Sequence, residues 1–400
     1  MTIKEKKELI KNAINNHNGI LKLAPTWVPR SFMIPGGRFK LDPRDLYALG
    51  SKRGGISERW LASTTKADNG LEAPEDEGLS YIVVDEAYSD KRILLKEAIE
   101  LMGDEILGET VMNKYGRWFA LAKIYDFLGQ TPFHIHQSDN YAKLVGKLGK
   151  PEAYYFPMQL NFTKGNFPYS FFGLDPTTKK IDIINCLKKW DNGYNDILNY
   201  SRAYKLIPGT GWDIPAGILH GPGTLVTFEV QRSSDVHMMF QSMIDGRRVS
   251  KELLTKDIPE EYQNDFEYIV NVLDWKGNID PGFKERHFCE PKYIKDPQAT
   301  KKEGYIEKLI IYKSKYFSAK EIIVFPDREI KIQEESAFGA IIIQGRGLLN
   351  DVQIESPSLI KYGQTTSDEF FITNIAAQNL CIKNTSKNEN LVILEHFGPK

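Results

Sequence analysis

The stretch Phe133-His134-Ile135-His136-Gln137 guides the interpretation of the whole chain. Side chains at positions i and i+2 of a β-strand leave the same face. If this stretch is extended, His134 and His136 can therefore reach one ion together, and few other local geometries allow that. The stretch predicts a strand that carries two metal ligands.

Glu152 and His220 are two further candidate ligands. His220 follows the turn Pro215-Ala216-Gly217, in which proline fixes φ and glycine permits angles that other residues avoid. Such a turn can aim His220 back at the wall of a barrel. A mixed set of nitrogen and oxygen ligands suits one divalent ion, zinc, iron, manganese, cobalt or nickel, better than it suits calcium. The sequence therefore predicts a metal site formed by His134, His136, Glu152 and His220, and it does not choose among these metals.

The overall composition narrows the class of protein. A chain of 400 residues with 41% hydrophobic content can bury a large core. Its formal net charge of −1 gives no field that would draw it onto nucleic acid or an anionic membrane, so we expect a small-molecule partner. The three cysteines are far apart in the sequence and fit a reducing compartment. No apolar run approaches the ~18 residues of a membrane span, so we expect a cytoplasmic protein.

Short apolar runs separated by glycine and proline turns recur along the chain, at 118–128, 154–160 and 221–231 and again between 305 and 400. This pattern favours a jelly roll or a sandwich. Helical periodicity predicts helices at 3–16, 88–107, 183–199 and 259–273. The expected fold is thus mainly β, with two jelly-roll β-barrel domains, helical insertions and an N-terminal helix.

The same pattern divides the chain into three parts. Residues 1–248 are expected to form the N-terminal helix and strands together with a metal-binding barrel. Residues 249–304 are expected to be a mostly helical connector, and residues 305–400 a second barrel without a metal. No residue-level repeat between the two β-rich halves is visible.

Several motifs occur in the order and approximate spacing of a known family. They are 133–142, Gly149-Lys150-Pro151-Glu152, Pro208-Gly209, 214–220 and 229–235. Together they resemble the type I mannose-6-phosphate isomerases of the cupin superfamily. The likeness covers most of the chain, is strongest from 121 to 237, and extends to the last hundred residues, which resemble that family's metal-free second cupin.

The resemblance implies roles for individual residues. It implies that His136, Glu152 and His220 bind zinc, that Lys150 faces the substrate, and that Glu229 is an acid/base candidate. This chain departs from the family at three positions. His134 stands where the family has a glutamine ligand, Pro132 where it has a phosphate-site serine, and Met239 where it has an active-site arginine. Methionine cannot offer the bidentate, charge-assisted bonds of arginine, and the candidates to replace it are Arg232 and His237.

Three functions stay open at this stage. The first is a mannose-6-phosphate isomerase-like intramolecular oxidoreductase, which interconverts an aldose and a ketose of a mannose-like sugar or sugar phosphate through an enediolate. The second is a non-haem iron oxygenase, because histidines and a carboxylate also form its facial triad. The third is a sugar-binding protein without catalysis. The oligomeric state is not predicted. His17 is expected to be solvated and His287 to be structural, and His396 stands alone in the second β unit.

Overall fold

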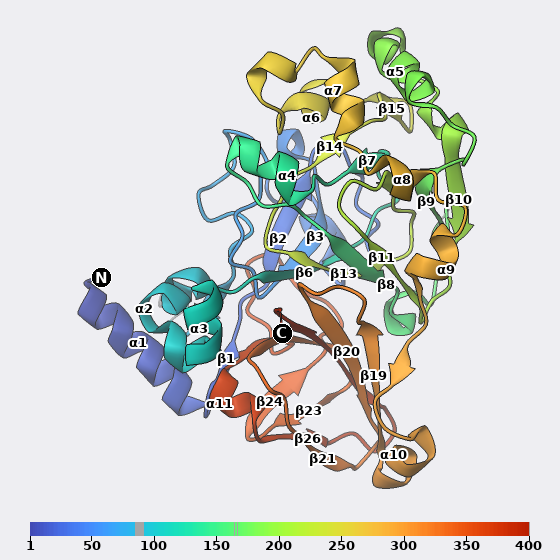
Figure 1. Ribbon diagram of the computed structural model, residues 1–400. Helices are drawn as coiled ribbons and strands as arrows, with labels where there is room; N and C mark the ends of the chain where they lie inside the picture. The colour runs from blue at the N-terminus through green and yellow to red at the C-terminus, as the bar shows by residue number, and fades with distance from the viewer. Residues whose placement is uncertain (85–91, 164, 166, 400) are drawn as a thin grey trace.

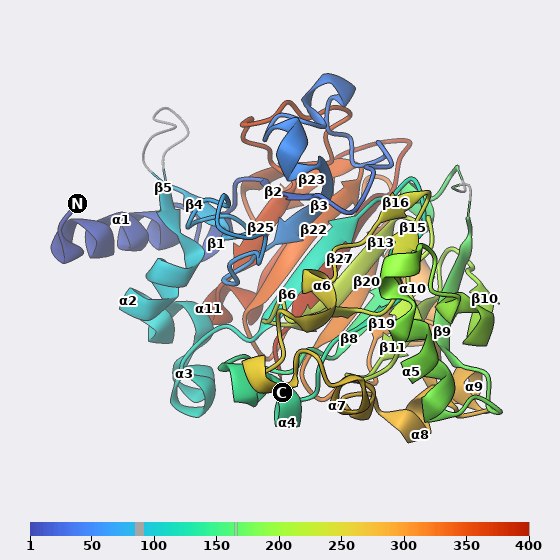
Figure 2. The same cartoon turned by 90° about the horizontal axis from the view of Figure 1, so that it is seen from above.

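The protein forms two antiparallel β units with helices around them. The structure is a computed structural model that describes residues 1–84, 92–163, 165 and 167–399. Strand (31%) exceeds helix (25%), so the chain is mainly β, and its architecture is that of a two-domain, cupin-like fold, as predicted. In Figure 1 the first β unit lies above the second, and Figure 2 shows α1, α2 and α3 on one side of the molecule, opposite α5, α8 and α9.

The first β unit consists of two sheets. The larger sheet has the order β17 (Phe288–Cys289), β11 (Gly211–Ile214), β8 (Glu152–Tyr155), β13 (Thr227–Arg232), β6 (Ala120–Tyr125), β3 (Gly55–Leu61) and β2 (Thr26–Arg30). The smaller sheet has the order β10 (Ser201–Lys205), β9 (Tyr169–Leu174), β12 (His220–Gly221), β7 (His134–Ile135) and β14 (Met238–Met239). Residues of both sheets line one cavity, which therefore lies between them.

The second β unit repeats this two-sheet arrangement. Its larger sheet has the order β1 (Ile20–Lys22), β25 (Glu369–Ile372), β22 (Phe338–Gln344), β27 (Leu391–Phe397), β20 (Ser318–Val324), β19 (Tyr305–Ile311) and β18 (Lys292–Tyr293). Its smaller sheet has the order β21 (Glu329–Ile332), β26 (Leu380–Asn384), β23 (Arg346–Leu349) and β24 (Val352–Glu355). Because Ile20 pairs with Ile372, a strand from near the N-terminus completes this C-terminal sheet. The boundaries at 248 and 304 remain predictions.

Strand β6 shows why the first unit contains such apolar runs. All six of its residues are buried. Ala122 and Ile124 belong to the same hydrophobic core as Leu394 of the second unit, whereas Lys123 and Tyr125 line the cavity. A strand that is covered on both faces has a nearly continuous apolar sequence. Lys123 is the exception in β6, because its side chain lies on the face of the strand that lines the cavity.

Polar contacts also join the two units. The buried Arg59 guanidinium on β3 donates to Asp368 at 2.8 Å and to Glu369 at 3.1 Å. The Tyr155 hydroxyl donates to Glu321 at 2.9 Å. These bonds fix the cavity-bearing sheet against the second unit.

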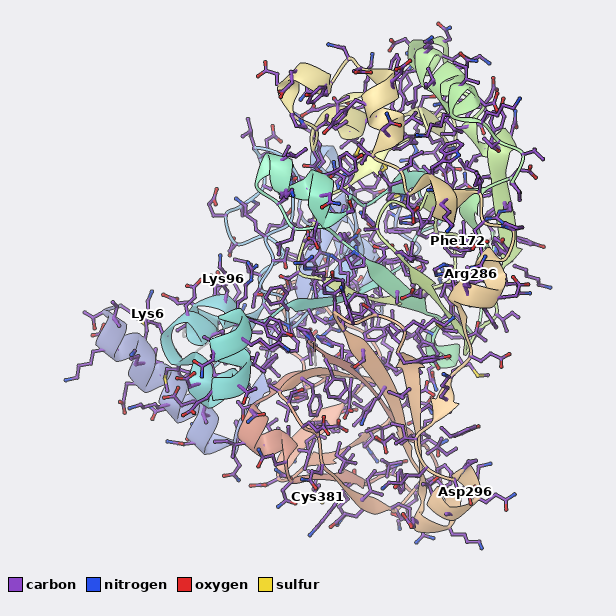
Figure 3. All side chains as sticks on the ribbon, viewed as in Figure 1. Lys6, Lys96, Phe172, Arg286, Asp296 and Cys381 are labelled. Carbon is purple, nitrogen blue, oxygen red and sulfur yellow. The ribbon has the colours of Figure 1, made fainter. Side chains whose placement is uncertain are left out.

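An aromatic cluster packs between strands β9 and β11 of the first unit. Phe172, labelled in Figure 3, is fully buried and packs against Trp212 with ring centroids 4.7 Å apart. Phe283, from a helix of the predicted connector, joins it at 6.0 Å. Part of the helical region is therefore integral to the core that carries β9 and β11.

The N-terminal helix is confirmed, and the second predicted helix is shorter than expected. Helix α1 spans Ile3–Asn16 and begins with a capping box of Thr2 and Glu5. Helix α2 spans Leu95–Leu107, and the expected start at 88–91 lies outside the described residues. The expectation of helix at 92–94 was wrong: these residues form β5 (Arg92–Leu94), which pairs with β4 (Tyr81–Val83). The ladder bonds offered by β4 outweigh the helical period there.

The predicted helix at 259–273 was wrong as a single element. It divides into a 3₁₀ turn, η7 (Glu260–Tyr262), and helix α7 (Phe266–Asn271). The division occurs because the Asp265 side chain accepts from the backbone N–H groups of Glu267 and Tyr268, which starts a new helix. The insertion predicted at 183–199 contains α5 (Lys180–Lys188) and two short 3₁₀ turns. The remaining helices are α3 (Glu109–Tyr115), α4 (Asp139–Ala142), α6 (Glu252–Thr255), α8 (Trp275–Asn278), α9 (Phe283–His287), α10 (Pro297–Glu303) and α11 (Asn374–Ala377).

Candidate metal centre

Three histidines converge in the smaller sheet of the first unit. His134 on β7 pairs directly with His220 on β12 and, across its other edge, with Met239 on β14. His136 follows two residues after His134, as the alternation of a strand predicts. One ring nitrogen from each histidine can be chosen so that all three atoms lie within 4.8 Å of one another, and all three side chains are buried. The predicted strand is shorter than expected: β7 covers His134 and Ile135, and His136 follows directly after its end, with its ring still beside the other two.

The turn before His220 has the glycine conformation that the sequence predicted. Gly217 has a φ of +85° and donates its backbone N–H to the His136 carbonyl oxygen at 2.7 Å. A Cβ at this position would lie 2.8 Å from the backbone nitrogen of Asp274. Glycine is thus required both by the backbone angle and by the close approach of the connector.

Backbone carbonyls fix the orientation of all three rings. The Nδ1 atoms of His134, His136 and His220 lie 2.6, 2.7 and 2.8 Å from the carbonyl oxygens of Pro132, Val236 and Ile218 respectively. A carbonyl only accepts, so each Nδ1 carries the hydrogen and each Nε2 keeps its lone pair. This is the arrangement in which histidines bind a metal through Nε2.

The opposite sheet supplies a row of charged side chains. In its register Glu229 on β13 is paired with Tyr154 on β8 and with Lys123 on β6. Glu152 lies two residues before Tyr154 on the same face. Sheet pairing alone therefore places Glu152, Glu229 and Lys123 side by side, facing the cavity.

The Glu152 carboxylate lies between two of the histidines. Its oxygens are 2.9 Å from His136 Nε2 and 3.1 Å from His220 Nε2. With both Nδ1 atoms protonated, neither contact contains a hydrogen, and His220 Nε2 is buried without a hydrogen-bond partner. Buried lone pairs that face one another are costly unless a cation lies between them. The residues therefore fit a divalent cation held by His134, His136, His220 and Glu152.

Lys150 borders this cluster. Its ammonium lies 2.9 Å from His136 Nε2, 2.8 Å from Glu152 and 3.5 Å from Glu229. Burial, followed by the charge of Lys150, lowers the pKa of His136 to about 4. Burial opposes ionisation of Glu152, but Lys150 and His136 outweigh it and hold its pKa well below its ordinary value. The histidine is thus neutral and the carboxylate ionised at neutral pH, which are the protonation states that ligands require.

The pKa of Glu229 is shifted in the opposite direction to that of Glu152. Burial, followed by the negative charge of Glu152, raises the pKa of Glu229 to about 8. Its partners are the ammonium groups of Lys123 at 3.3 Å and Lys150 at 3.5 Å. Two neighbouring carboxylates whose environments separate their pKa values are typical of an acid/base site.

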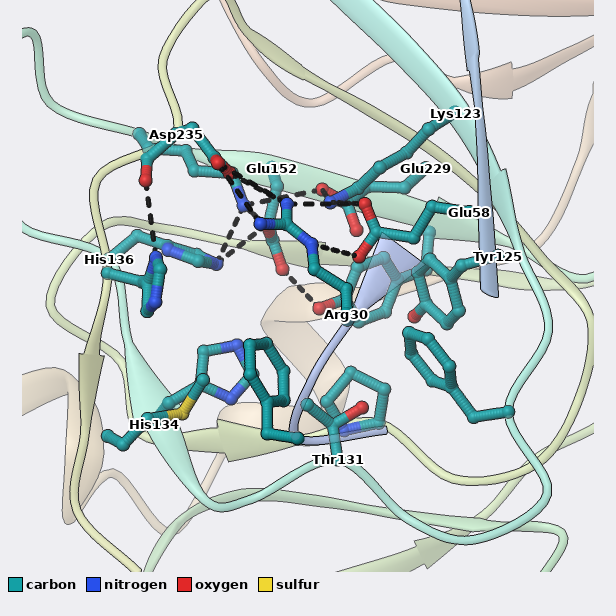
Figure 4. Close-up of a pocket in the computed structure, with 17 residues that line it drawn as sticks. Arg30, Glu58, Lys123, Tyr125, Thr131, His134, His136, Glu152, Glu229 and Asp235 are labelled. Atoms are coloured by element: carbon teal, nitrogen blue, oxygen red, sulfur yellow. Dashed lines mark hydrogen bonds and ion pairs between the residues drawn. The ribbon is translucent and has the colours of Figure 1, made fainter. Parts of the chain in front are cut away.

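Sequence reasoning missed several residues of the cavity, which holds about 50 Å³. Figure 4 shows Arg30 between Glu58 and Asp235. Its guanidinium lies 3.0 Å from Glu58 and 3.1 Å from Asp235. Tyr154, expected to be core, also lines the cavity and donates its hydroxyl to Glu152. Because Arg30 and Asp235 are 205 residues apart, no local spacing could reveal their contact. A local signal was available only for Lys123, whose charge interrupts the apolar residues 118–125.

Arg232 does not join this group. It is not among the residues that line the cavity, and its guanidinium instead donates to Asp139 at 2.6 Å and lies 4.9 Å from the centre of the Tyr316 ring. His237 and Met239, in contrast, both line the cavity. The structure thus brings together every predicted site residue except Arg232.

The comparisons with known proteins agree on the fold. No family model and no curated protein matches this chain. The mannose 6-phosphate isomerase from Bacillus subtilis superposes with a TM-score of 0.62 at 18% identity, over 95% of this chain and 99% of that one. A mannose 6-phosphate isomerase bound with zinc and yttrium, and a variant of the phosphomannose isomerase from Salmonella typhimurium, each superpose with a TM-score of 0.60 at 12% identity, over 96% of this chain and 100% of theirs. The chain shares their complete two-domain fold.

Proposed function

We propose that this protein is a metal-dependent aldose–ketose isomerase that acts on a mannose-like sugar. One observation carries the proposal: the candidate ligands His134, His136 and Glu152 line a cavity together with an acid/base pair, Lys150 and Glu229, and the fourth candidate ligand, His220, lies 3.1 Å from Glu152. The fold is that of solved mannose-6-phosphate isomerases, which supports the same reaction class.

Zinc is the ion that we propose first. Three imidazoles and one carboxylate suit zinc, and one solved structure of the same fold is described as zinc-bound. The donor set also accepts iron, manganese, cobalt or nickel. When bound, such an ion acts as a Lewis acid that polarises the carbonyl and the adjacent hydroxyl of a sugar.

The protein's own residues would move the proton. Isomerisation transfers a proton between two adjacent carbons, and the group that carries it must change its protonation state near neutral pH. Glu229, with its pKa raised to about 8, meets this condition and faces the cavity. Lys150 lies between Glu229 and Glu152, where it can donate a hydrogen bond to an oxygen of the substrate. Arg232 is left out of this proposal because it lies outside the cavity lining.

Removing and restoring the metal tests this function. Interconversion of mannose and fructose, or of their 6-phosphates, is expected to stop after treatment with a chelator and to return when zinc or another divalent ion is added. Oxygen uptake is measured in the same samples. Turnover that needs oxygen would instead favour an iron oxygenase, and sugar binding without interconversion by any metal-loaded sample would favour a binding protein.

The location proposed for this activity is the cytoplasm. The three cysteines are free thiols, which a reducing compartment preserves. Among the described residues, no helix is long and apolar enough to span a membrane.

A further inference from the structure

We infer that the cavity binds an unphosphorylated sugar, whose hydroxyl groups are recognised by two neutral side chains, Thr131 and His237. This inference rests on the proposed function and narrows its substrate class. It concerns the same cavity, and it follows from which of the lining side chains already have partners and which do not.

The positive side chains that line the cavity are all engaged with carboxylates. Arg30 contacts Glu58 at 3.0 Å and Asp235 at 3.1 Å. Lys123 lies 3.3 Å from Glu229, and Lys150 lies 2.8 Å from Glu152. A phosphate group would have to break one of these buried pairs, which would leave a carboxylate without its partner in a low-dielectric site.

The charges of the lining side chains also give a phosphate no net attraction. Three cations and four carboxylates line the cavity: Arg30, Lys123, Lys150, Glu58, Glu152, Glu229 and Asp235. Because the pKa of Glu229 is raised to about 8, that carboxyl is mainly protonated at pH 7, so the lining carries no net charge and the proposed divalent ion is its only excess positive charge. In the proposed reaction that ion faces the carbonyl end of the sugar. A phosphate would compete for the ion instead of extending the binding site.

Among the described residues that line the cavity, Glu152 and Glu229 have ion-pair partners, and the other buried polar atoms without a hydrogen-bond partner belong to neutral side chains. These atoms are Thr131 Oγ1, His237 Nε2 and the Tyr125 hydroxyl oxygen. His237 Nδ1 lies 3.2 Å from the carbonyl oxygen of Asp235, so Nδ1 carries the hydrogen and Nε2 offers a lone pair. Burial, followed by the charge of Lys256, lowers the pKa of His237 well below its ordinary value, which keeps the ring neutral.

The chemistry of His237 distinguishes a hydroxyl from a phosphate. A sugar hydroxyl has a hydrogen to donate to the Nε2 lone pair, whereas a fully ionised phosphate has only acceptor oxygens. Thr131 can donate to or accept from a neighbouring hydroxyl.

The main test compares free and phosphorylated sugars on the zinc-loaded protein. We expect kcat/KM for mannose and fructose to exceed the values for their 6-phosphates by at least about tenfold, which corresponds to one hydrogen bond gained or lost. A higher kcat/KM for the 6-phosphates would overturn this inference and leave the proposed isomerase intact. If neither kind of sugar is interconverted, the proposed function itself fails.

Variants of the two neutral side chains test the recognition directly. His237→Phe keeps the ring shape but removes the acceptor, and it is expected to raise KM for the free sugar about tenfold with little change in kcat. His237→Gln places an amide oxygen near the former Nε2 and is expected to restore KM to within about threefold of wild type. An unchanged KM in His237→Phe, with wild-type zinc content, contradicts the inference.

Thr131→Val is the second, independent variant. It removes only the hydroxyl, and its KM is also expected to rise about tenfold. If His237→Phe loses its zinc or fails to fold, Thr131→Val decides the question. A wild-type KM in Thr131→Val would then overturn the assignment of these residues to hydroxyl recognition.

Discussion

Replacing Glu152 by glutamine tests the metal site most sharply. The change keeps the shape of the side chain but removes the charge that lies 2.9 Å from His136 and 3.1 Å from His220. Loss of a residue that only orients a ligand typically costs 10–100-fold in metal affinity. Loss of a ligand itself should therefore cost at least about 100-fold, or about 2.7 kcal/mol. Zinc content by mass spectrometry and affinity by competition with a chromogenic chelator measure the effect.

Glu229→Gln is the matched control. It makes the same chemical change in a buried carboxylate on the adjacent strand, but the ion-pair partners of Glu229 are Lys123 and Lys150. Because its pKa is raised to about 8, this carboxyl is mainly protonated at pH 7, and glutamine resembles that form. We expect Glu229→Gln to keep zinc but to lose isomerase activity. Equal zinc affinity in Glu152→Gln and wild type, or equal loss in both variants, would refute the assignment.

Two further changes test the fold around the site. Gly217→Ala introduces a Cβ at a φ of +85° and 2.8 Å from the backbone of Asp274, so we expect the free energy of unfolding to fall by about 1–3 kcal/mol in urea titrations. Gly146→Ala, at a φ of +70° with open space around it, is the control and should cost less; equal costs would show that the contact with Asp274 is unimportant. The second change is His396→Leu. His396 is buried, both its ring nitrogens lack partners, and burial lowers its pKa to about 3. A histidine whose folded-state pKa lies below its unfolded value of about 6.5 contributes stability above pH 6.5 and loses it as the pH falls towards 3. Between pH 7 and pH 5 the unfolding free energy of wild type should therefore fall by about 2 kcal/mol more than that of His396→Leu. Parallel curves of unfolding free energy against pH would contradict this.

The sequence predicted those parts of the site that depend on local geometry. The spacing of His134 and His136, and the glycine turn before His220, follow from the alternation of a strand and from the backbone angles of glycine, and the structure has both. Glu152 was predicted as a ligand from its residue type, whereas the role of Glu229 came from the resemblance, and sheet register explains why the two are neighbours.

Contacts between distant segments could not be predicted in this way. Arg30 reaches Asp235, and strand β1 pairs with β25 near the other end of the chain, because the tertiary fold brings these segments together. The single helix expected at 259–273 failed for a local reason, since the cap formed by Asp265 overrides the apolar period. Arg232 shows the limit of reasoning from proximity in sequence. It follows Glu229 by three residues on β13, yet its side chain turns to Asp139 and Tyr316.

The measurement that tests the central claim most directly is proton NMR of the zinc-loaded protein with mannose or fructose in D₂O. A metal-dependent isomerase that shuttles a proton through Glu229 should interconvert the two sugars and place solvent deuterium on the carbon that receives the proton. Exchange should vanish in Glu229→Gln, although that variant keeps its zinc. Zinc-loaded wild-type protein that neither interconverts these sugars or their 6-phosphates nor incorporates deuterium into them would contradict the account.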